Sequence, residues 1–576
     1  IPMRVKKSQS KHSTSYMIIK DVYVNGKKTT KVVEALGNDK EILEKHPGVD
    51  PYEWAKQYAK TLTDKEKEKK AKIVAKFDPH KPIPKNDQRS FNVGYLFLQS
   101  LYHQLKLDKV CRIISDKHNF SYDLNTILSR LIYMRILNPR SKKGTFECAQ
   151  DLLEAHEVES QHIYRALDVL AEESNTIEEM VYQNSLEIVE RNQQVLYYDC
   201  TNFYFEIEEA EGLKQYGMSK ENRPNPIVQM GLFMDGNGLP LSFVIHSGNQ
   251  NEQPTLKPLE KRIIRDFNLS QFIVCTDAGL SSHDNRLYNS FGNRGFITTQ
   301  SIKLLKKHLK EWALDTKDWL PVGESHRSSR KINLEDLDLE KDKGHYYKER
   351  WIHENGLEQR LIITFSPKHK RYQEEIRRKQ IERAMKKADN PSQLKKKRPT
   401  DFKRFLKETH VTKEGEIAKD FQVTVDQEKI KEEAKYDGLY GICTNVSGDS
   451  EEILKISHRR WEIEETFRIL KSEMRARPVF VRKDDRIKAH FLTCFLSLLV
   501  YRILEKTLDE AYTCPDIIDT LRKMRVFEYS GEGYIPTYTR TDLTDQLHEE
   551  FGFRTDTEII PQKRMKNILK QTKKQK

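Results

Sequence analysis

The stretch from residue 195 to 302 constrains the fold more than any other part of the chain. It contains short apolar runs at 195–201, 227–234, 239–245, 272–276 and 295–302. The second and third runs flank Asp235-Gly236-Asn237-Gly238, which is typical of a tight hairpin. Helical periodicity over 256–266 separates the third run from the fourth. A meander of three strands, followed by alternating helices and strands, predicts a mixed α/β sheet.

Helical patterns flank this predicted sheet. Leucine and isoleucine recur at helical spacing from Phe91 to about Arg191, which predicts a helical N-terminal domain. After the sheet, the sequence predicts a helix over 457–474 and an apolar helix over 489–505. Its apolar run, from Phe491 to Tyr501 with Ile503 and Leu504 beyond, is too short to span a bilayer, so we expect a buried helix and no membrane partner.

The first 85 residues are predicted to form a β-hairpin and a linker. Residues 16–33 alternate between apolar and polar, and Asn25-Gly26 interrupts them with a strong turn signal. A run rich in lysine and glutamate follows, and prolines occur over 79–85. These features are typical of a small β segment joined to the rest of the chain by a connecting stretch.

Composition limits the class of protein. The chain has 576 residues, 37% of them hydrophobic and 32% charged, with a mean hydropathy of −0.76. These values predict several domains with much water-exposed surface. No signal segment opens the sequence, so we expect a cytoplasmic location. The seven cysteines contain no C-x-x-C pair, which argues against a disulfide framework or a thiolate zinc site.

Positive charge is concentrated in one segment. The formal net charge is +13, and residues 368–407 contain sixteen Lys and Arg against five Asp and Glu. Such a local excess suits contact with a phosphate backbone. A solvated, charged helix explains it equally well.

Two aspartates lie where strands could present them for chemistry. Asp199 falls within an apolar strand, where an ionised carboxylate is costly unless it is paired or bound to metal. Asp277 ends the fourth predicted strand, and ligand sites on open α/β sheets lie at such strand ends. Taken singly, each aspartate is better explained as the cap of a turn.

The helix predicted over 457–474 carries a third acid. At about 100° per residue, Arg460, Glu464 and Lys471 lie within roughly 40° of one another beside an apolar stripe. The glutamate could bind a metal ion while the two cations hold phosphates. Alternatively, Arg460 and Glu464 form an ordinary i,i+4 ion pair that stabilises the helix by about 0.3 kcal/mol.

These residues resemble the motifs of a known family. The segment from Arg460 to Lys471 is similar to the Y-x₂-R-x₃-E-x₆-K signature of bacterial insertion-sequence transposases of the DDE class, with Glu464 at the catalytic glutamate. Asp199-Cys200-Thr201 resembles the first motif of that family, and Asp277-Ala278-Gly279 resembles the second. The sequence departs from the signature at its tyrosine, where Ser457 stands.

The resemblance, which covers roughly residues 195–505, implies a fold, and the sequence patterns predict the order of the parts. The expected fold class is α/β, with an RNase H-like mixed sheet interrupted by a large insertion domain and with a helical N-terminal region. The expected parts are an N-terminal β-hairpin segment and linker, a helical N-terminal domain, the first part of the core, an insertion domain, the second part of the core and a C-terminal basic region, at residues 1–85, 86–192, 193–302, 303–450, 451–505 and 506–576.

The resemblance also implies chemistry and partners. Asp199, Asp277 and Glu464 would be the catalytic residues and would hold two Mg²⁺ ions, for which Mn²⁺ could substitute. Arg460 and Lys471 would contact DNA phosphates, and Ser457 would keep a weaker version of the tyrosine's contact. The expected partners are double-stranded DNA, as element ends and as target, and a second copy of the chain in a homodimer.

Two other functions remain open at this stage. One is a nuclease or resolvase on the same RNase H-like core, which cuts DNA without joining it. The other is a catalytically inactive transposase relative that binds DNA. Within the insertion, Trp351 is a candidate for contact with a flipped base by its location, but core packing also explains it.

Overall fold

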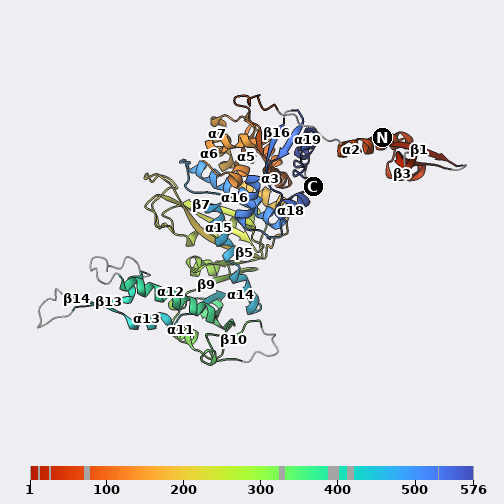
Figure 1. Cartoon of the computed structure of the whole chain (residues 1–576). Coiled ribbons are helices and arrows are strands. Elements are labelled where there is room, and N and C mark those ends of the chain that lie inside the picture. The colour runs from red at the N-terminus through yellow and green to blue at the C-terminus, as the bar shows by residue number, and fades with distance from the viewer. Residues whose placement is uncertain are drawn as a thin grey trace. The chain divides into compact units, whose positions relative to one another are not determined.

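The computed structural model describes residues 2–10, 13–24, 27–70, 78–323, 331–386, 401–410, 421–529 and 531–574. The chain divides into two compact units (Figure 1). The first unit contains residues 1–87 with 529–533, and the second contains residues 88–528 with 534–576.

The first unit contains the predicted hairpin. Strands β2 and β3 pair antiparallel from Ser15 to Asn38, which confirms the pairing, whereas Asn25-Gly26 lies outside the described residues. Tyr16, Ile42 and Ala55 form a small core of their own. The elements of this unit are β1 (Arg4–Gln9), β2 (Thr14–Val24), β3 (Lys27–Asn38), α1 (Asp39–Lys45) and α2 (Pro51–Lys70).

The second unit is built on a nine-stranded mixed sheet of order β10-β11-β12-β15-β9-β8-β5-β6-β7. Pairs β5–β8 and β8–β9 are parallel and the remaining pairs are antiparallel. This arrangement confirms the predicted mixed α/β class. The strands are β5 (Val195–Tyr204), β6 (Ile227–Asp235), β7 (Pro240–Ser247), β8 (Phe272–Thr276), β9 (Arg294–Gln300), β10 (Leu320–Pro321), β11 (Tyr346–Glu354), β12 (Leu357–Phe365) and β15 (Leu439–Thr444).

Helices cover both faces of β5. Tyr198 and Cys200 lie in the core beneath α9 (Leu256–Asp266), whereas Tyr197 and Phe203 belong to the large core on the opposite face. Because strand side chains alternate between faces, Asp199 is directed to the same face as Tyr197 and Phe203. Strand β5 is therefore buried on both sides, and the Asp199 carboxylate lies beneath the helices that follow the insertion.

The strands of the predicted insertion extend the main sheet. Residues 346–365 of this predicted insertion form a hairpin of β11 and β12, and β15 then joins β12 to β9 by antiparallel pairing. This continuity could not be predicted from the sequence, because it depends on pairing between distant segments that cover the open edge of β9. The predicted domain boundaries stay a prediction.

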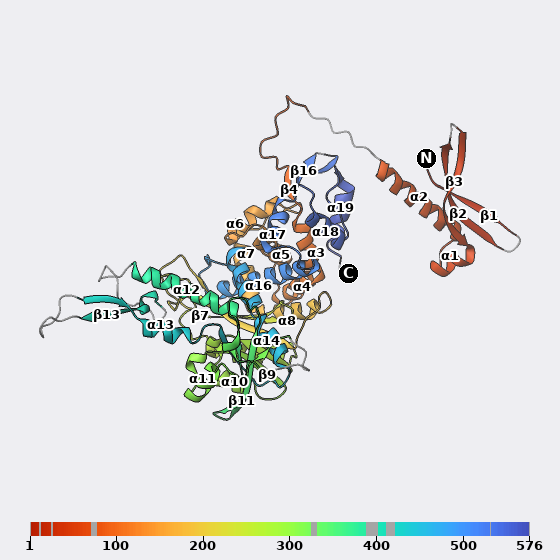
Figure 2. The same ribbon diagram turned by 60° about the horizontal axis from the view of Figure 1, so that its bottom comes forward.

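The rest of this insertion projects from the sheet (Figures 1 and 2). Strands β13 and β14 form a separate two-stranded sheet. Residues 387–400, which hold part of the predicted basic segment, lie outside the described residues. The projecting elements are α12 (Pro367–Met385), β13 (Leu406–His410), β14 (Phe421–Val425) and α13 (Gln427–Ala434).

Both ends of the second unit's sequence build one helical layer (Figure 1). Phe97 in α3 packs against Phe551 and Phe553, so the C-terminal region is folded rather than a tail. The layer contains α3 (Tyr95–Gln104), α4 (Leu107–His118), α5 (Leu124–Leu137), α6 (Lys142–Cys148), α7 (Ser160–Glu172), α8 (Ser174–Ser185), α16 (Asp484–Thr507), α17 (Cys514–Lys523), α18 (Asp542–Phe551) and α19 (Gln562–Gln571).

Helix α16 lies at the centre of this layer, against α5 and α7. Within the part of the chain that the structure describes, it is the one helix long and apolar enough to cross a membrane by length and composition. However, 89% of its most apolar window is buried inside the protein. Burial of α16 confirms the predicted core helix, whereas the prediction that its apolar stretch is too short to span a bilayer is wrong, because the helix extends over 24 residues.

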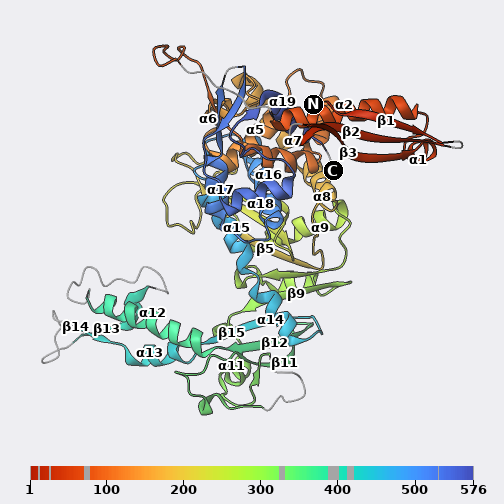
Figure 3. The same ribbon diagram turned by 45° about the vertical axis from the view of Figure 1, so that its right-hand side comes forward.

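The helix expected over 457–474 is interrupted. Helix α14 (Ser450–His458) ends before Arg459, and α15 (Trp461–Ser472) begins after Arg460. Figure 3 shows the two helices following one another along the sheet, α14 near β9 and α15 near β5. Uniform helical periodicity on both sides of the break conceals it in the sequence.

Candidate active site

Asp199 and Asp277 lie on neighbouring parallel strands. Tyr197 of β5 is the register partner of Cys275 of β8, and each aspartate comes two residues after its member of this pair. Alternation therefore directs the two carboxylates to the same face, on strands about 4.8 Å apart. Pairing between distant segments brings together two acids that the sequence could only suggest separately.

The Asp277 carboxylate also has a structural role. It accepts a hydrogen bond at 3.0 Å from the backbone N–H of Leu280 and caps a short 3-10 helix, Ala278–Leu280. The hydroxyl of Thr298 donates to the Asp277 carbonyl oxygen at 3.1 Å. The turn-capping interpretation is thus correct, and it leaves the remaining carboxylate lone pairs for other partners.

Burial and charge act on Asp199. Burial, together with the negative charge of Asp277, raises the pKa of the Asp199 carboxyl to about 6 against the lowering effect of Lys220 and Arg460. A carboxylate with a raised pKa beside a second acid is short of positive charge. This is the electrostatic environment in which a bound cation is stabilised.

Arg460 joins Glu464 to the two aspartates. Its guanidinium contacts the Glu464 carboxylate at 3.0 Å across one helical turn. Burial alone would lower the pKa of Arg460, but the neighbouring Tyr440 hydroxyl and the carboxylates of Glu464, Asp199 and Asp277 together raise it. The predicted i,i+4 ion pair is therefore present, and its arginine lies within electrostatic reach of all three acids.

The three acids interact electrostatically with Arg460 without forming a closed cluster. Their carboxylate oxygens do not all lie within 4.8 Å of one another, a separation at which one ion could be shared. Glu464 is 57% exposed and can change rotamer freely, whereas the aspartates are fixed on the sheet. Three oxygen donors of this kind suit Mg²⁺ or Mn²⁺, so the residues fit a divalent cation once Glu464 turns from Arg460.

Lys471 lies on the same face as the aspartates. Its ammonium donates to the Thr201 hydroxyl at 2.7 Å, two residues along β5 from Asp199. Burial and the nearby charge of Lys220 lower the pKa of Lys471 to about 8, against the raising effect of Asp199. The predicted phosphate-binding lysine therefore borders the acids.

Two further residues at this site carried no signal in the sequence. Lys220, from the segment between β5 and β6, forms an ion pair with Glu252 at 3.2 Å, and Asp199 raises its pKa against the opposing effect of burial. Tyr440, on β15, shares a 2.6 Å hydrogen bond with Thr299 and is 37% exposed. Only pairing between distant strands brings Tyr440 near Arg460.

Ser457 lies near the other signature residues but is buried. It is 8% exposed near the end of α14, and its carbonyl oxygen accepts a hydrogen bond from the Arg460 backbone N–H at 3.3 Å. The neighbouring Ile456 carbonyl accepts a hydrogen bond from the Tyr197 hydroxyl at 2.9 Å, which ties α14 to β5. A hydroxyl contact from Ser457 to DNA would require movement here.

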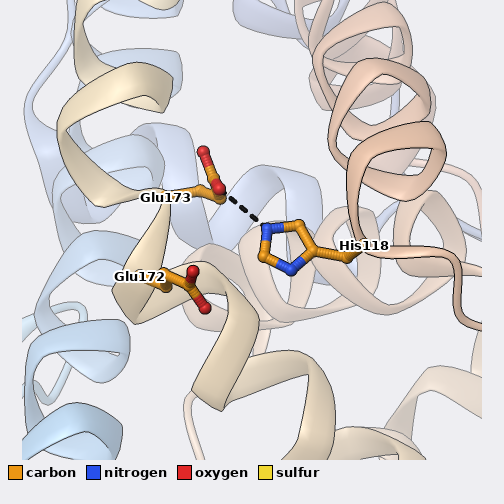
Figure 4. A group of neighbouring side chains, drawn as sticks. All are labelled: His118, Glu172 and Glu173. Atoms are coloured by element: carbon orange, nitrogen blue, oxygen red, sulfur yellow. Dashed lines mark hydrogen bonds and ion pairs between the residues drawn. The ribbon is translucent and has the colours of Figure 1, made fainter.

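Other candidates lie apart from the three acids. Among the described residues, His118, Glu172 and Glu173 form the group whose ligand atoms come within 4.8 Å (Figure 4). The Glu173 carboxylate already binds Lys117 and, at 2.7 Å, His118, which is typical of a structural ion pair. Trp351 is 47% exposed, so its assignment to core packing is wrong.

The described part of the basic segment is partly neutralised. In α12, Arg378 pairs with Glu375 and Glu382, and Arg377 pairs with Asp437. A cavity of about 460 Å³ lies between this helix and the adjoining ends of β9 and β15, lined in part by Lys303, Arg377 and Arg404. Both the solvated helix and the phosphate-contact interpretation remain compatible with this arrangement.

Comparison with known proteins identifies the family. The family model of the transposase DDE domain matches residues 194–500, more than half of the chain, and so the chain belongs to this family. Its function is that of a transposase. DDE transposases use divalent metal ions, which agrees with the donor set described above. A comparison with curated protein sequences gives no match.

Two solved structures resemble the chain weakly. The first is a piggyBac transposase synaptic complex with hairpin DNA, at 8% identity and a TM-score of 0.35, covering 83% of this chain and 84% of that chain. The second is a Mos1 transposase paired-end complex with the left transposon end, at 10% identity and a TM-score of 0.13, covering 44% of this chain and 68% of that chain.

Proposed function

We propose that this transposase cleaves the ends of a DNA element and joins them to target DNA, with Asp199, Asp277 and Glu464 as its catalytic metal ligands. The observation that carries the proposal is the register of β5 and β8, which aligns the two aspartates on one face. Arg460 supports the inclusion of Glu464, because it contacts that carboxylate at 3.0 Å and interacts with both aspartates.

The residues around the acids have separate tasks in this proposal. Asp199 and Asp277 hold cations from the rigid sheet, and Glu464 completes the ligand set from α15. Two divalent ions would supply activation of the attacking oxygen and stabilisation of the leaving oxygen. Arg460 and Lys471 bind phosphate oxygens and fix the DNA backbone in position. The phosphate role predicted for Ser457 stays a prediction.

The partners follow from the same proposal. Double-stranded DNA binds first as element ends and then as target, and the family resemblance supports a homodimer that holds two ends together. It also supports a bacterial, cytoplasmic location. A sizing experiment by light scattering, with and without end DNA, measures the number of copies in the complex.

The test compares Asp199→Ala, Asp277→Ala and Glu464→Ala with Glu465→Ala, a matched control on α15 whose carboxylate pairs with Arg468. DNA carrying the native flanks of the gene is incubated with Mg²⁺, and cleavage, joining and binding are measured separately. Each ligand variant should lose more than about 100-fold in cleavage, since even the partners of metal ligands contribute about 10- to 100-fold. Binding should persist.

Three outcomes would redirect the assignment. Wild-type cleavage by any ligand variant removes that acid from the site. Cleavage without joining favours the nuclease alternative. Binding without cleavage in either Mg²⁺ or Mn²⁺ favours an inactive relative.

A further inference from the structure

Glu221 occupies the centre of a cluster of cations beside the proposed active site. It belongs to the segment that connects β5 to β6. Its carboxylate lies 3.4 Å from the Lys471 ammonium, forms an ion pair with Arg477 and lies 3.9 Å from Arg223. One carboxylate therefore faces three positive groups, and its side chain is 22% exposed.

Contacts with β5 hold these cations in place independently of Glu221. The guanidinium carbons of Arg223 and Arg477 lie 4.1 and 5.6 Å from the ring centroid of Tyr204. Lys471 donates to the Thr201 hydroxyl and lies 5.4 Å from the ring centroid of Phe203. Removal of the Glu221 charge would leave an anchored cationic site, because aromatic rings and a hydroxyl support its members.

The cluster borders the acids through Lys471, which contacts Thr201 on the same face of β5 as Asp199. Asp199, Thr201 and Tyr204 lie along the same strand, and a rise of about 3.3 Å per residue places Tyr204 about 16 Å from Asp199. Lys220, adjacent to Glu221 in sequence, interacts with Asp199. A DNA strand whose scissile phosphate lies at the acids would therefore meet Lys471, and Arg477 contacts the same Glu221 carboxylate as Lys471.

We propose that Lys471, Arg477 and Arg223 form a binding site for a DNA phosphate, and that Glu221 fills this site until DNA displaces it. A carboxylate resembles a phosphodiester in presenting two oxygens that share a negative charge, and both form charge-assisted hydrogen bonds with guanidinium and ammonium groups. This inference rests on the proposed function, because it takes DNA as the ligand.

Occupation by Glu221 has a consequence for affinity. A DNA phosphate must displace the Glu221 carboxylate from its ion pairs before it can bind here. The gain in binding free energy is therefore smaller than three unpaired cations would give. Neutralising Glu221 should strengthen binding of duplex DNA, and neutralising Arg477 should weaken it. Net charge on its own would predict the same increase for any acid removed from this segment.

The experiment measures the affinity of a labelled 30-base-pair duplex of arbitrary sequence, by fluorescence anisotropy in EDTA over a series of KCl concentrations. Glu221→Gln should raise affinity about 3- to 10-fold at low salt, with a smaller difference at high salt. Adding Arg477→Gln to this variant should reverse the gain. Glu209→Gln is the matched control, because Glu209 is an exposed acid of the same segment.

The outcomes separate this inference from the proposed function. Unchanged or weaker binding by Glu221→Gln overturns the inference, and so does an equal gain from Glu209→Gln. Loss of fold is monitored by the thermal midpoint, and Glu221→Ala provides a second variant. A chain that binds no duplex in any form contradicts the proposed function as well, whereas normal cleavage with no effect of Glu221→Gln contradicts this inference alone.

Discussion

At the scale of single residues, Arg460 explains how three acids coexist before a cation binds. The shared register of Asp199 and Asp277 brings two negative charges together, and the pKa of Asp199 rises as a result of burial and of this charge. The Arg460 guanidinium compensates part of this negative charge and contacts the Glu464 carboxylate at 3.0 Å. A bound cation would take over that compensation and release Arg460 for a phosphate.

A buried lysine leads to a prediction about pH. Lys142 is 4% exposed, and its ammonium has no hydrogen-bond partner among the described residues. Burial, together with Arg135, lowers its pKa from 10.5 to about 7. As pH falls from 10.5 to 7, the Lys142 side chain binds a proton in the unfolded chain but not in the folded chain. The contribution of Lys142 to the free energy of unfolding therefore decreases over this range and is smallest below pH 7.

Lys142→Met should therefore raise the thermal midpoint, because it removes a buried charge and keeps similar volume. The gain should be about 3 °C or more at pH 6.5 and close to zero at pH 10.5. Differential scanning fluorimetry at the two pH values measures it. Equal gains at both values would show that Lys142 is solvated in the folded protein.

The residues of the site were predictable to different degrees. Asp199, Asp277 and Glu464 could be proposed from local patterns and family resemblance, because each has a characteristic sequence neighbourhood. Lys220 and Tyr440 could not, since their position depends on a connecting segment and on pairing between β15 and β9. Charge alone does not distinguish them from other surface residues.

At the scale of elements, the hairpin β6–β7 is fixed by a buried ion pair. The Arg191 guanidinium contacts the Asp235 carboxylate at 2.7 Å, and both side chains are 1% exposed. Asp235 also accepts hydrogen bonds from the backbone N–H groups of Asn237 and Leu239 at 2.9 and 3.0 Å. The pair connects the segment between α8 and β5 to this hairpin.

Arg191→Met should destabilise the second unit by about 3 to 5 kcal/mol, because it leaves a buried carboxylate without its cation. The matched control is Arg265→Met. Arg265 pairs with Asp266 but is 74% exposed, so its replacement should change the free energy of unfolding by less than about 1 kcal/mol. Chemical denaturation measures both. Similar effects of the two variants would contradict a special role for Arg191.

Elements were predicted well where periodicity is local. Helix 256–266 and strand 272–276 have the predicted bounds, since their apolar patterns end at turn residues. The break between α14 and α15 was missed because both helices keep one periodicity across Arg459 and Arg460. Extension of the sheet by β12 and β15 was not predicted, because the sequence of a strand does not indicate which distant strand it pairs with.

At the scale of the whole molecule, segments distant in sequence complete the second unit. Strand β4 (Ser90–Asn92) pairs with β16 (Arg525–Tyr529), and Phe97 packs against Phe551 and Phe553. The first unit has its own core around Tyr16. All residues proposed for catalysis and phosphate contact lie in the second unit.

A chain that begins at Gln88 should therefore fold and cleave DNA at an unchanged rate in Mg²⁺. A chain that ends at Glu528 should fail to fold, because α3 loses its contacts with the C-terminal helices. Circular dichroism and a plasmid-nicking assay measure these properties. Loss of nicking in the first chain, with its fold intact, would show that residues 1–87 contribute to the reaction.

The most direct test of the proposed metal site is the position of a bound Mn²⁺ ion in a crystal of the full chain, determined from its anomalous scattering. We expect a peak that contacts carboxylate oxygens of both Asp199 and Asp277, with Glu464 turned from Arg460 toward it. A peak confined to His118, Glu172 and Glu173, or Mn²⁺ bound without any contact to Asp199, would contradict the assignment.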